Sequence, residues 1–72
     1  MSDFNISNDQ KQALLQQRID QLNLEGYNHE LNLKQFEAIG ASESQEAQNS
    51  RDGIDAIKKA LAVLAEELES TN

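Results

Sequence analysis

The side chain best suited to chemistry in this chain is its single histidine, His29. Glu25 lies one helical turn before it, and Glu30 and Asp55 are carboxylates that a fold could bring near it. A histidine oriented by a carboxylate occurs in general-base sites and in metal sites. Helical di-iron proteins, however, use Glu-x-x-His on two helices, whereas this chain has Glu25-x-x-x-His29 once. We therefore expect His29 to be structural, with a metal-binding or acid–base role as the alternative.

In the structural interpretation His29 packs in the contact between two helices, against Gly53, and is hydrogen-bonded to a carboxylate. The rest of the chain offers little other chemistry. Cysteine is absent, which removes disulfides and thiolate zinc sites. No serine has a histidine partner placed by a motif, and Gly26, Gly40 and Gly53 are isolated rather than gathered in a phosphate-binding loop. We expect no enzymatic activity, no catalytic residue, no cofactor and no bound metal.

The charge balance is strongly acidic, with 13 acidic residues against 6 basic ones and a net charge of −7. Nucleic acids and anionic membrane surfaces attract basic proteins, so we expect neither as a direct partner. The longest apolar stretch, 60–65, is far shorter than the roughly 20 residues that span a bilayer. No positively charged segment precedes an apolar run at the N-terminus, as it would in a signal peptide. These features predict a soluble, cytoplasmic protein.

Two stripes of large apolar residues, each recurring at steps of three and four, predict two long helices. The two helices have similar lengths and a short break lies between them at 40–42, which favours an antiparallel pair. The fold class is therefore all-α, a two-helix hairpin that associates into a four-helix bundle or a similar oligomer. The stripes consist of Leu15, Ile19, Leu22, Leu33 and Phe36, and of Ile54, Ile57, Leu61, Leu64 and Leu68.

Capping signals give the expected helix boundaries. Ser7 and Gln10 form a capping box, and Gly40 can adopt the left-handed conformation that ends a helix. Ser42 and Gln45 repeat the capping box at the start of the second helix. We expect a disordered segment at 1–6, one hairpin domain over 7–70, helices at 8–39 and 43–70, and a turn at 40–42.

The segment 49–53 leaves one alternative open, because Ser-Arg-Asp-Gly is typical of a turn. We favour a continuous helix through it, since one glycine costs only about 1 kcal/mol in a helix interior. Ala47 and Ser50 also keep the apolar stripe in phase upstream of Gly53.

The turn also predicts which residues of the two helices lie level with each other. If it centres near Ala41, facing residues have numbers that sum to about 82 or 83. Four pairs then place a large side chain against a small one, as close packing requires. These pairs are Gly26 with Ile57, Gly53 with His29, Leu33 with Ser50, and Phe36 with Ala47.

The first helix carries a second apolar face, formed by Leu24, Tyr27 and Leu31 on nearly the opposite side from its main stripe. Two helices alone cannot cover both faces. The second helix has a milder counterpart, and we expect the two sets to form one patch for self-association, with a dimer favoured. A trimer, docking on another protein's helices, and scattered surface leucines are the alternatives. The expected interface consists of Leu24, Tyr27, Leu31, Ala56, Ala60 and Val63.

The segment KQALLQQRIDQL at 11–22, followed by EGYNHELN at 25–32, resembles small helical-hairpin proteins of marine tailed bacteriophages, including cyanophages. The resemblance covers most of the chain and is weakest at 49–53. It implies a viral origin, an accessory or assembly role, and a place in the host cytoplasm. The family has no assigned activity, so no site residue is carried over.

These observations favour a non-enzymatic interaction or assembly module that acts through self-association and through protein partners of the host or the virion. The alternative is an acidic inhibitor that binds a host protein, as a mimic of nucleic acid. Such a mimic should gather its acidic residues on one face. Here they are spread around both predicted helices, which counts against the alternative.

Overall fold

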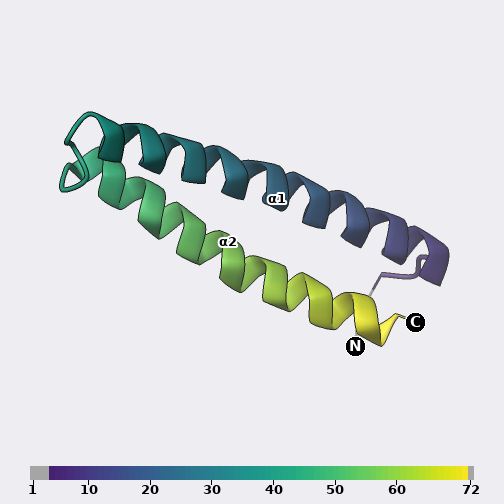
Figure 1. The fold of residues 1–72 in the computed structure, drawn as a ribbon. Helices are drawn as coiled ribbons and strands as arrows, with labels where there is room; N and C mark the ends of the chain where they lie inside the picture. Colours follow the sequence, from purple (N-terminus) through teal and green to yellow (C-terminus); the bar gives the residue numbers. More distant parts are fainter. Residues whose placement is uncertain (1–3, 72) are drawn as a thin grey trace.

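The computed structural model describes residues 4–71, which form two α-helices and no strand. Helix α1 covers Asn8–Ala38 and helix α2 covers Gln45–Ser70. The helices run antiparallel beside each other as a rod with extents of 50 × 17 × 16 Å (Figure 1). The predicted all-α hairpin is therefore confirmed, and its association with other copies is taken up below.

The capping box predicted at the start of α1 is present. Ser7 Oγ accepts a hydrogen bond from the backbone N–H of Gln10 at 3.1 Å, and Gln10 Oε1 accepts one from the backbone N–H of Ser7 at 3.0 Å. These bonds satisfy N–H groups that have no partner within the helix. Asp9 adds a negative charge in the first turn, where the helix dipole favours it.

Helix α1 ends at Ala38, with Ile39 as C-cap, one residue before the predicted end. Gly40 has a φ of 75°, the left-handed conformation expected for it. The N–H of Ala41 donates to the carbonyl of Phe36 at 2.7 Å, and the N–H of Gly40 donates to the carbonyl of Glu37 at 3.2 Å. This pair of bonds is a Schellman motif, which satisfies the last carbonyls of the helix.

The start predicted for the second helix is wrong by two residues, because Ser44 and not Ser42 is its N-cap. Ser44 Oγ accepts from the N–H of Ala47 at 3.2 Å and donates to the carbonyl of Ala41 at 2.7 Å. Ser42 instead offers its backbone carbonyl to the Arg51 guanidinium at 2.6 Å. The chain needs the extra residues to reverse direction after the Schellman motif, so the turn is longer than 40–42.

Helix α2 is continuous from Gln45 to Ser70. The favoured prediction for 49–53 is thus confirmed, and the turn chemistry of Ser-Arg-Asp-Gly is overridden. Gly53 lies inside the helix, where it faces α1 at close range. Packing between the helices therefore decides the local conformation, as it commonly does where propensity is weak.

A single seam of facing residues joins the two helices, and every seam residue is buried or half-buried. At the end of the hairpin opposite the turn, Gln12 Nε2 donates to the carbonyl of Thr71 at 3.3 Å, so these two residues lie level with each other. Steps of three and four along each helix keep the seam on one side, as in a coiled coil. The seam consists of Gln12, Leu15, Ile19, Leu22, Gly26, His29, Leu33 and Phe36 from α1, and of Ala47, Ser50, Ile54, Ile57, Leu61, Leu64, Leu68 and Thr71 from α2.

Candidate interaction surface

Both predicted glycine contacts occur in the seam. A Cβ built on Gly26 would lie 3.5 Å from Ile57 Cγ2, an ordinary van der Waals distance. A Cβ built on Gly53 would lie only 2.8 Å from His29 Nε2, which is too close for a real side chain. The imidazole of His29 therefore occupies the space that a larger residue at 53 would fill. Both contacts confirm the large-to-small register that the sequence predicts.

The expected hydrogen bond between His29 and a carboxylate is not formed within residues 4–71. Glu25, the nearest candidate along the helix, accepts instead from Gln21 Nε2 at 3.3 Å, and Asp55 pairs with Lys59. The ring of His29 is held by its contact with Gly53 rather than by a charge. No group of three His, Cys, Asp or Glu side chains in the described chain could hold a metal ion. The contact geometry around His29 is that of a packing residue.

The seam is only partly closed to solvent. Within residues 4–71 the buried residues are Leu15, Ala47 and Ser50, and no large side chain is fully enclosed. The remaining seam leucines and isoleucines are half-buried. This follows from the architecture, since each helix has only one neighbour and its other sides stay open. The hairpin alone therefore leaves much of its apolar surface in water.

Outside the seam, large apolar residues stand exposed along the rod. Leu24 is 65% exposed, Tyr27 58% and Val63 64%, while Leu31 is less exposed at 40%. Ala56 is exposed, and Ala60 is half-buried against the seam. All six residues of the expected interface thus retain accessible surface.

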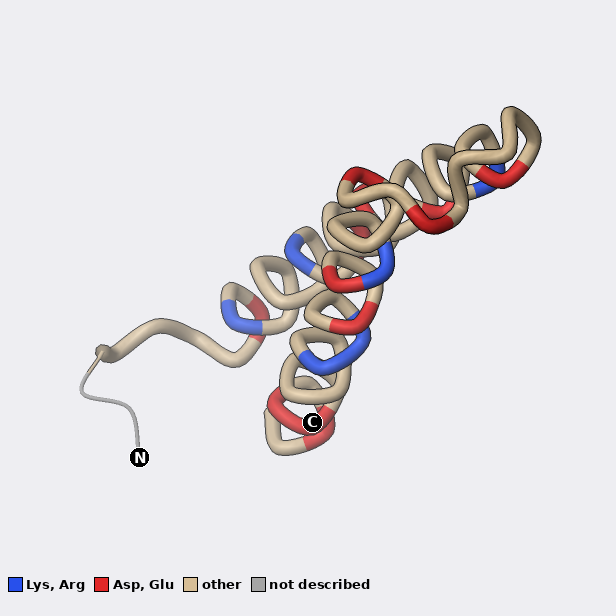
Figure 2. Tube along the Cα trace, turned by 90° about the vertical axis from the view of Figure 1, so that its left-hand side faces the viewer, with Lys and Arg blue, Asp and Glu red and all other residues tan. Residues whose placement is uncertain are grey.

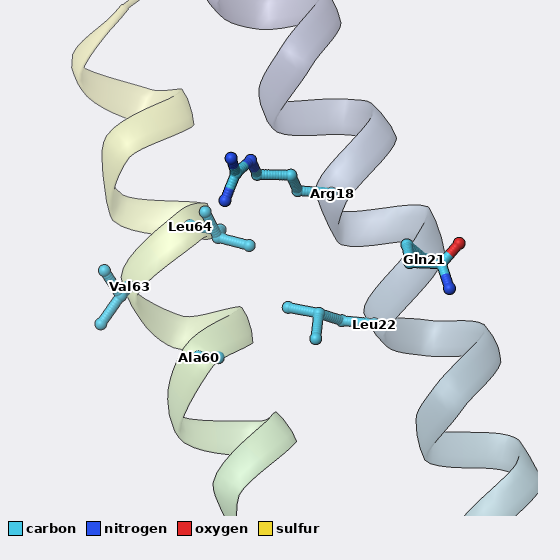
Figure 3. A pocket seen from close by; sticks show the side chains of 6 residues that line it. All are labelled: Arg18, Gln21, Leu22, Ala60, Val63 and Leu64. Carbon is cyan, nitrogen blue, oxygen red and sulfur yellow. The ribbon is translucent and has the colours of Figure 1, made fainter.

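One groove of about 460 Å³ runs between the helices around Ala60. In Figure 3 the side chains of Leu22 and Leu64 point towards each other across it, and Arg18 extends over Leu64. Val63 lies on the outer rim of α2 and points away from α1 (Figure 3). The floor of this groove is apolar, and no acidic side chain lines it.

A second groove lies on the other side of the seam. It contains Tyr27, and it is bordered by Asn23, Glu30 and Lys58. Leu22 lines both grooves, but its neighbour Gln21 lines the first and Asn23 the second. Successive residues are turned by about 100° around a helix, so Gln21 and Asn23 lie on opposite sides of Leu22. The grooves therefore open in different directions.

The structure consequently does not bring the six expected interface residues into one patch. Ala60 and Val63 belong to the first groove, whereas Tyr27 belongs to the second. Leu24, Tyr27 and Leu31 share a third depression that α1 forms alone. Ala56 lies one helical turn before Ala60, so it is on the side of the first groove, whereas Tyr27 at the same level lies in the second.

An additional apolar cluster lies at the end of the hairpin opposite the turn and was not predicted from the sequence. Phe4 and Ile6 lie beside Leu14 and Leu15 of α1, and Glu67 and Thr71 of α2 border the same groove. Leu14 and Ile6 are nearly half exposed. The position of Leu14 could have been predicted. It lies ten residues before Leu24, just under three helical turns, and so falls on the same side of the helix. Of the segment 1–6, predicted to be disordered, residues 1–3 lie outside the described part of the chain. Residues 4–6 have no period from which their position beside α1 could be predicted.

Charges are spread along both helices, and Figure 2 shows acidic and basic residues along the whole rod. Lys59 Nζ and Asp55 Oδ2, 3.1 Å apart within α2, form the one ion pair among residues 4–71. Both side chains are largely exposed, so the pair contributes little to stability. Lys11 and Glu67 border the same groove but do not form an ion pair. The electrostatic pattern thus marks no concentrated binding site.

No protein-family model, curated protein or solved structure matches this chain. The likeness to phage proteins therefore stays a prediction from the sequence. Neither helix, judged over the described part of the chain, has the length and apolar composition needed to cross a membrane.

Proposed function

We propose that this chain is a small, non-enzymatic helical module that acts by self-association and by presenting its helices to protein partners. The observation that carries the proposal is the exposure of Leu24, Tyr27 and Val63 on a hairpin whose own seam is only half closed. Burying such side chains is favourable by about 1.5–3 kcal/mol each. A second layer of helices would bury them.

Size supports the same proposal. A chain of 72 residues has a small core, and such chains use disulfides, metals or oligomerisation for added stability. The sequence has no cysteine, and the described residues contain no group suited to a metal. Association with further helices is the device that fits the exposed surface.

The proposal is tested by the mass of the native chain in sedimentation equilibrium at several concentrations. We expect a mass above that of the monomer. The variant Leu24→Glu with Leu31→Glu should shift the equilibrium towards monomer, because each charge would have to be buried unpaired. Asn23→Glu with Asn32→Glu is the matched control, with the same added charge at exposed sites of the same helix. A native chain that is a folded monomer at every concentration contradicts the proposal.

The acidic-inhibitor alternative has less support, because the acidic residues follow both helices instead of gathering on one face (Figure 2). An accessory or assembly role in a phage is a further part of the proposal and is supported by the sequence resemblance alone. Capture of a virion protein or a host protein by the native chain, lost in the Leu24→Glu and Leu31→Glu variant, is the corresponding test.

A further inference from the structure

We propose that α1 carries a second helix-packing strip on its back, and that α1 of a second copy of this chain packs against it in antiparallel orientation. This inference rests on the self-association proposed above, and adds which face is used and in which register. In the resulting dimer the two α1 helices lie at the centre and the two α2 helices lie outside.

The strip consists of residues that recur at alternating steps of four and three along the side of α1 opposite the seam. At its edges Gln21 also borders the groove around Ala60, and Leu14 also borders the groove next to Glu67 and Thr71. Every one of them is exposed, while every residue of the seam is buried or half-buried. None of them is charged. The strip residues are Gln10, Leu14, Gln17, Gln21, Leu24, Asn28, Leu31, Gln35 and Ala38.

All the charged residues of α1 avoid this strip as well as the seam, and lie on the two flanks between them. A helix with a single neighbour normally carries charges on its solvent face. An uncharged strip that runs along most of a helix, with the spacing of a coiled-coil seam, is typical of contact with a second helix. The flank residues are Asp9, Lys11, Arg18, Asp20, Glu25, Glu30, Lys34 and Glu37.

The exposed area is sufficient for a dimer of this kind. The chain exposes 5627 Å², about 1,200 Å² more than the size relation for compact monomers gives at 8.0 kDa. Part of this excess comes from the rod shape and from exposed residues before α1 such as Phe4. A standard interface removes roughly 800 Å² from each partner. One helix-to-helix contact along α1 would bring the exposed area close to the ordinary range.

The identity of the occupant follows from the way the strip complements itself. In one antiparallel register Leu14 faces the partner's Leu31, and Gln17 faces the partner's Asn28. Leucine thus meets leucine and amide meets amide in the layers away from the centre, twice each about a two-fold axis. At the centre Gln21 faces the partner's Leu24, and the contact spans nearly all of α1. Sliding by one heptad in one direction places two leucines of each chain against amides, Leu24 against the partner's Asn28 and Leu31 against the partner's Gln21. Sliding in the other direction leaves Leu31 beyond the overlap. An interface of this kind closes on itself, so it ends at a dimer.

The test uses single cysteines in the full chain, which has none of its own. Leu14→Cys and Leu31→Cys are made separately, and one of them carries a mass tag. After mild oxidation of their mixture we expect the mixed covalent dimer as the main product, with little product from either variant alone. Ala62→Cys, at an exposed site of α2, is the control for random collision. Far-UV circular dichroism checks that each variant keeps its helices.

The other outcomes identify which statement fails. If Leu14→Cys links efficiently to itself, the α1 helices are parallel and the proposed register is wrong. If Val63→Cys links well and the Leu14 and Leu31 pair does not, the groove around Ala60 is the interface and this inference is overturned, while self-association stands. If the native chain sediments as a monomer, self-association itself is contradicted and the inference falls with it.

Discussion

The contact between His29 and Gly53 gives a sharp test of the seam, because Gly26 provides a matched control in the other helix. Both glycines lie inside helices and face the seam. A methyl group at Gly26 would meet Ile57 at an ordinary 3.5 Å. A methyl group at Gly53 would lie 2.8 Å from His29 Nε2 and 2.9 Å from its Cε1. The imidazole must therefore move in Gly53→Ala, whereas Gly26→Ala needs no rearrangement.

The expected magnitudes follow from two opposing effects. Alanine is favoured over glycine by about 1 kcal/mol in a helix interior, so Gly26→Ala should raise the free energy of unfolding by about that amount. The same gain applies to Gly53→Ala, but it is offset by the cost of driving the His29 side chain from its rotamer, about 0.5–1.5 kcal/mol. Gly53→Ala should therefore be close to neutral. In this size range 1 kcal/mol corresponds to a change in Tm of roughly 4–8 °C.

The assay is urea unfolding followed by circular dichroism, with all variants at one protein concentration because self-association would contribute to stability. The same Gly53→Ala change is also measured in a His29→Ala background. There the obstacle is gone, and the substitution should be stabilising by about 1 kcal/mol, like Gly26→Ala. If Gly53→Ala is as stabilising as Gly26→Ala with His29 intact, the imidazole does not lie over Gly53 and the seam geometry is refuted.

Three further predictions concern the turn and the surface. Ser44→Ala should lower the free energy of unfolding by about 1 kcal/mol through loss of the α2 cap, whereas Ser42→Ala should change it little; an equal loss in both contradicts the assigned cap. Gly40→Ala should be destabilising by about 1–2 kcal/mol, as measured by urea unfolding, because φ is 75° there. Lys59→Gln, which breaks the exposed pair with Asp55, should change the unfolding midpoint only slightly, by about 0.5 kcal/mol or less, and a larger loss would show that the pair is coupled to other charges.

The register of the hairpin could be predicted because small residues of one helix must lie level with large residues of the other. Gly26 and Gly53 are costly in helices, and each is level with a bulky residue of the other helix once the turn is placed near Ala41. The structure confirms both contacts. Side-chain size is known from the sequence alone. A wrong register would therefore be recognised, because it would pair large residues with large ones and glycines with small ones.

The start of α2 could not be predicted with the same accuracy, because two serines compete for the same role. Ser42 and Ser44 both precede helix-forming residues, and the Ser42–Gln45 spacing matches a capping box better. The choice depends on how many residues the chain needs after Gly40 to bring α2 alongside α1. That number is set by the three-dimensional path of the turn, including the bond from Ser44 to the carbonyl of Ala41.

The grouping of the second apolar faces failed for a different reason. Pairing by residue number fixes how far along the rod two residues lie, but it does not fix the direction in which each points around its helix. Tyr27 and Ala60 are close in level yet lie on opposite sides of the seam. The exposure of Leu24, Tyr27 and Val63 was readable from the sequence. Their division between faces follows from the turn of about 100° per residue away from the seam, which pairing by residue number leaves out.

The turn between α1 and α2 also determines the order in which the hairpin can assemble. Seam pairs near the turn are separated by few residues, whereas Gln12 and Thr71 are 59 residues apart. Loop closure costs about 0.6 kcal/mol more for each doubling of length, so the first contacts form beside the turn. Each pair of seam residues that forms then shortens the loop that the next pair must close. We therefore expect folding to begin beside Gly40 and to extend towards the termini, and lengthening the turn should slow its first step.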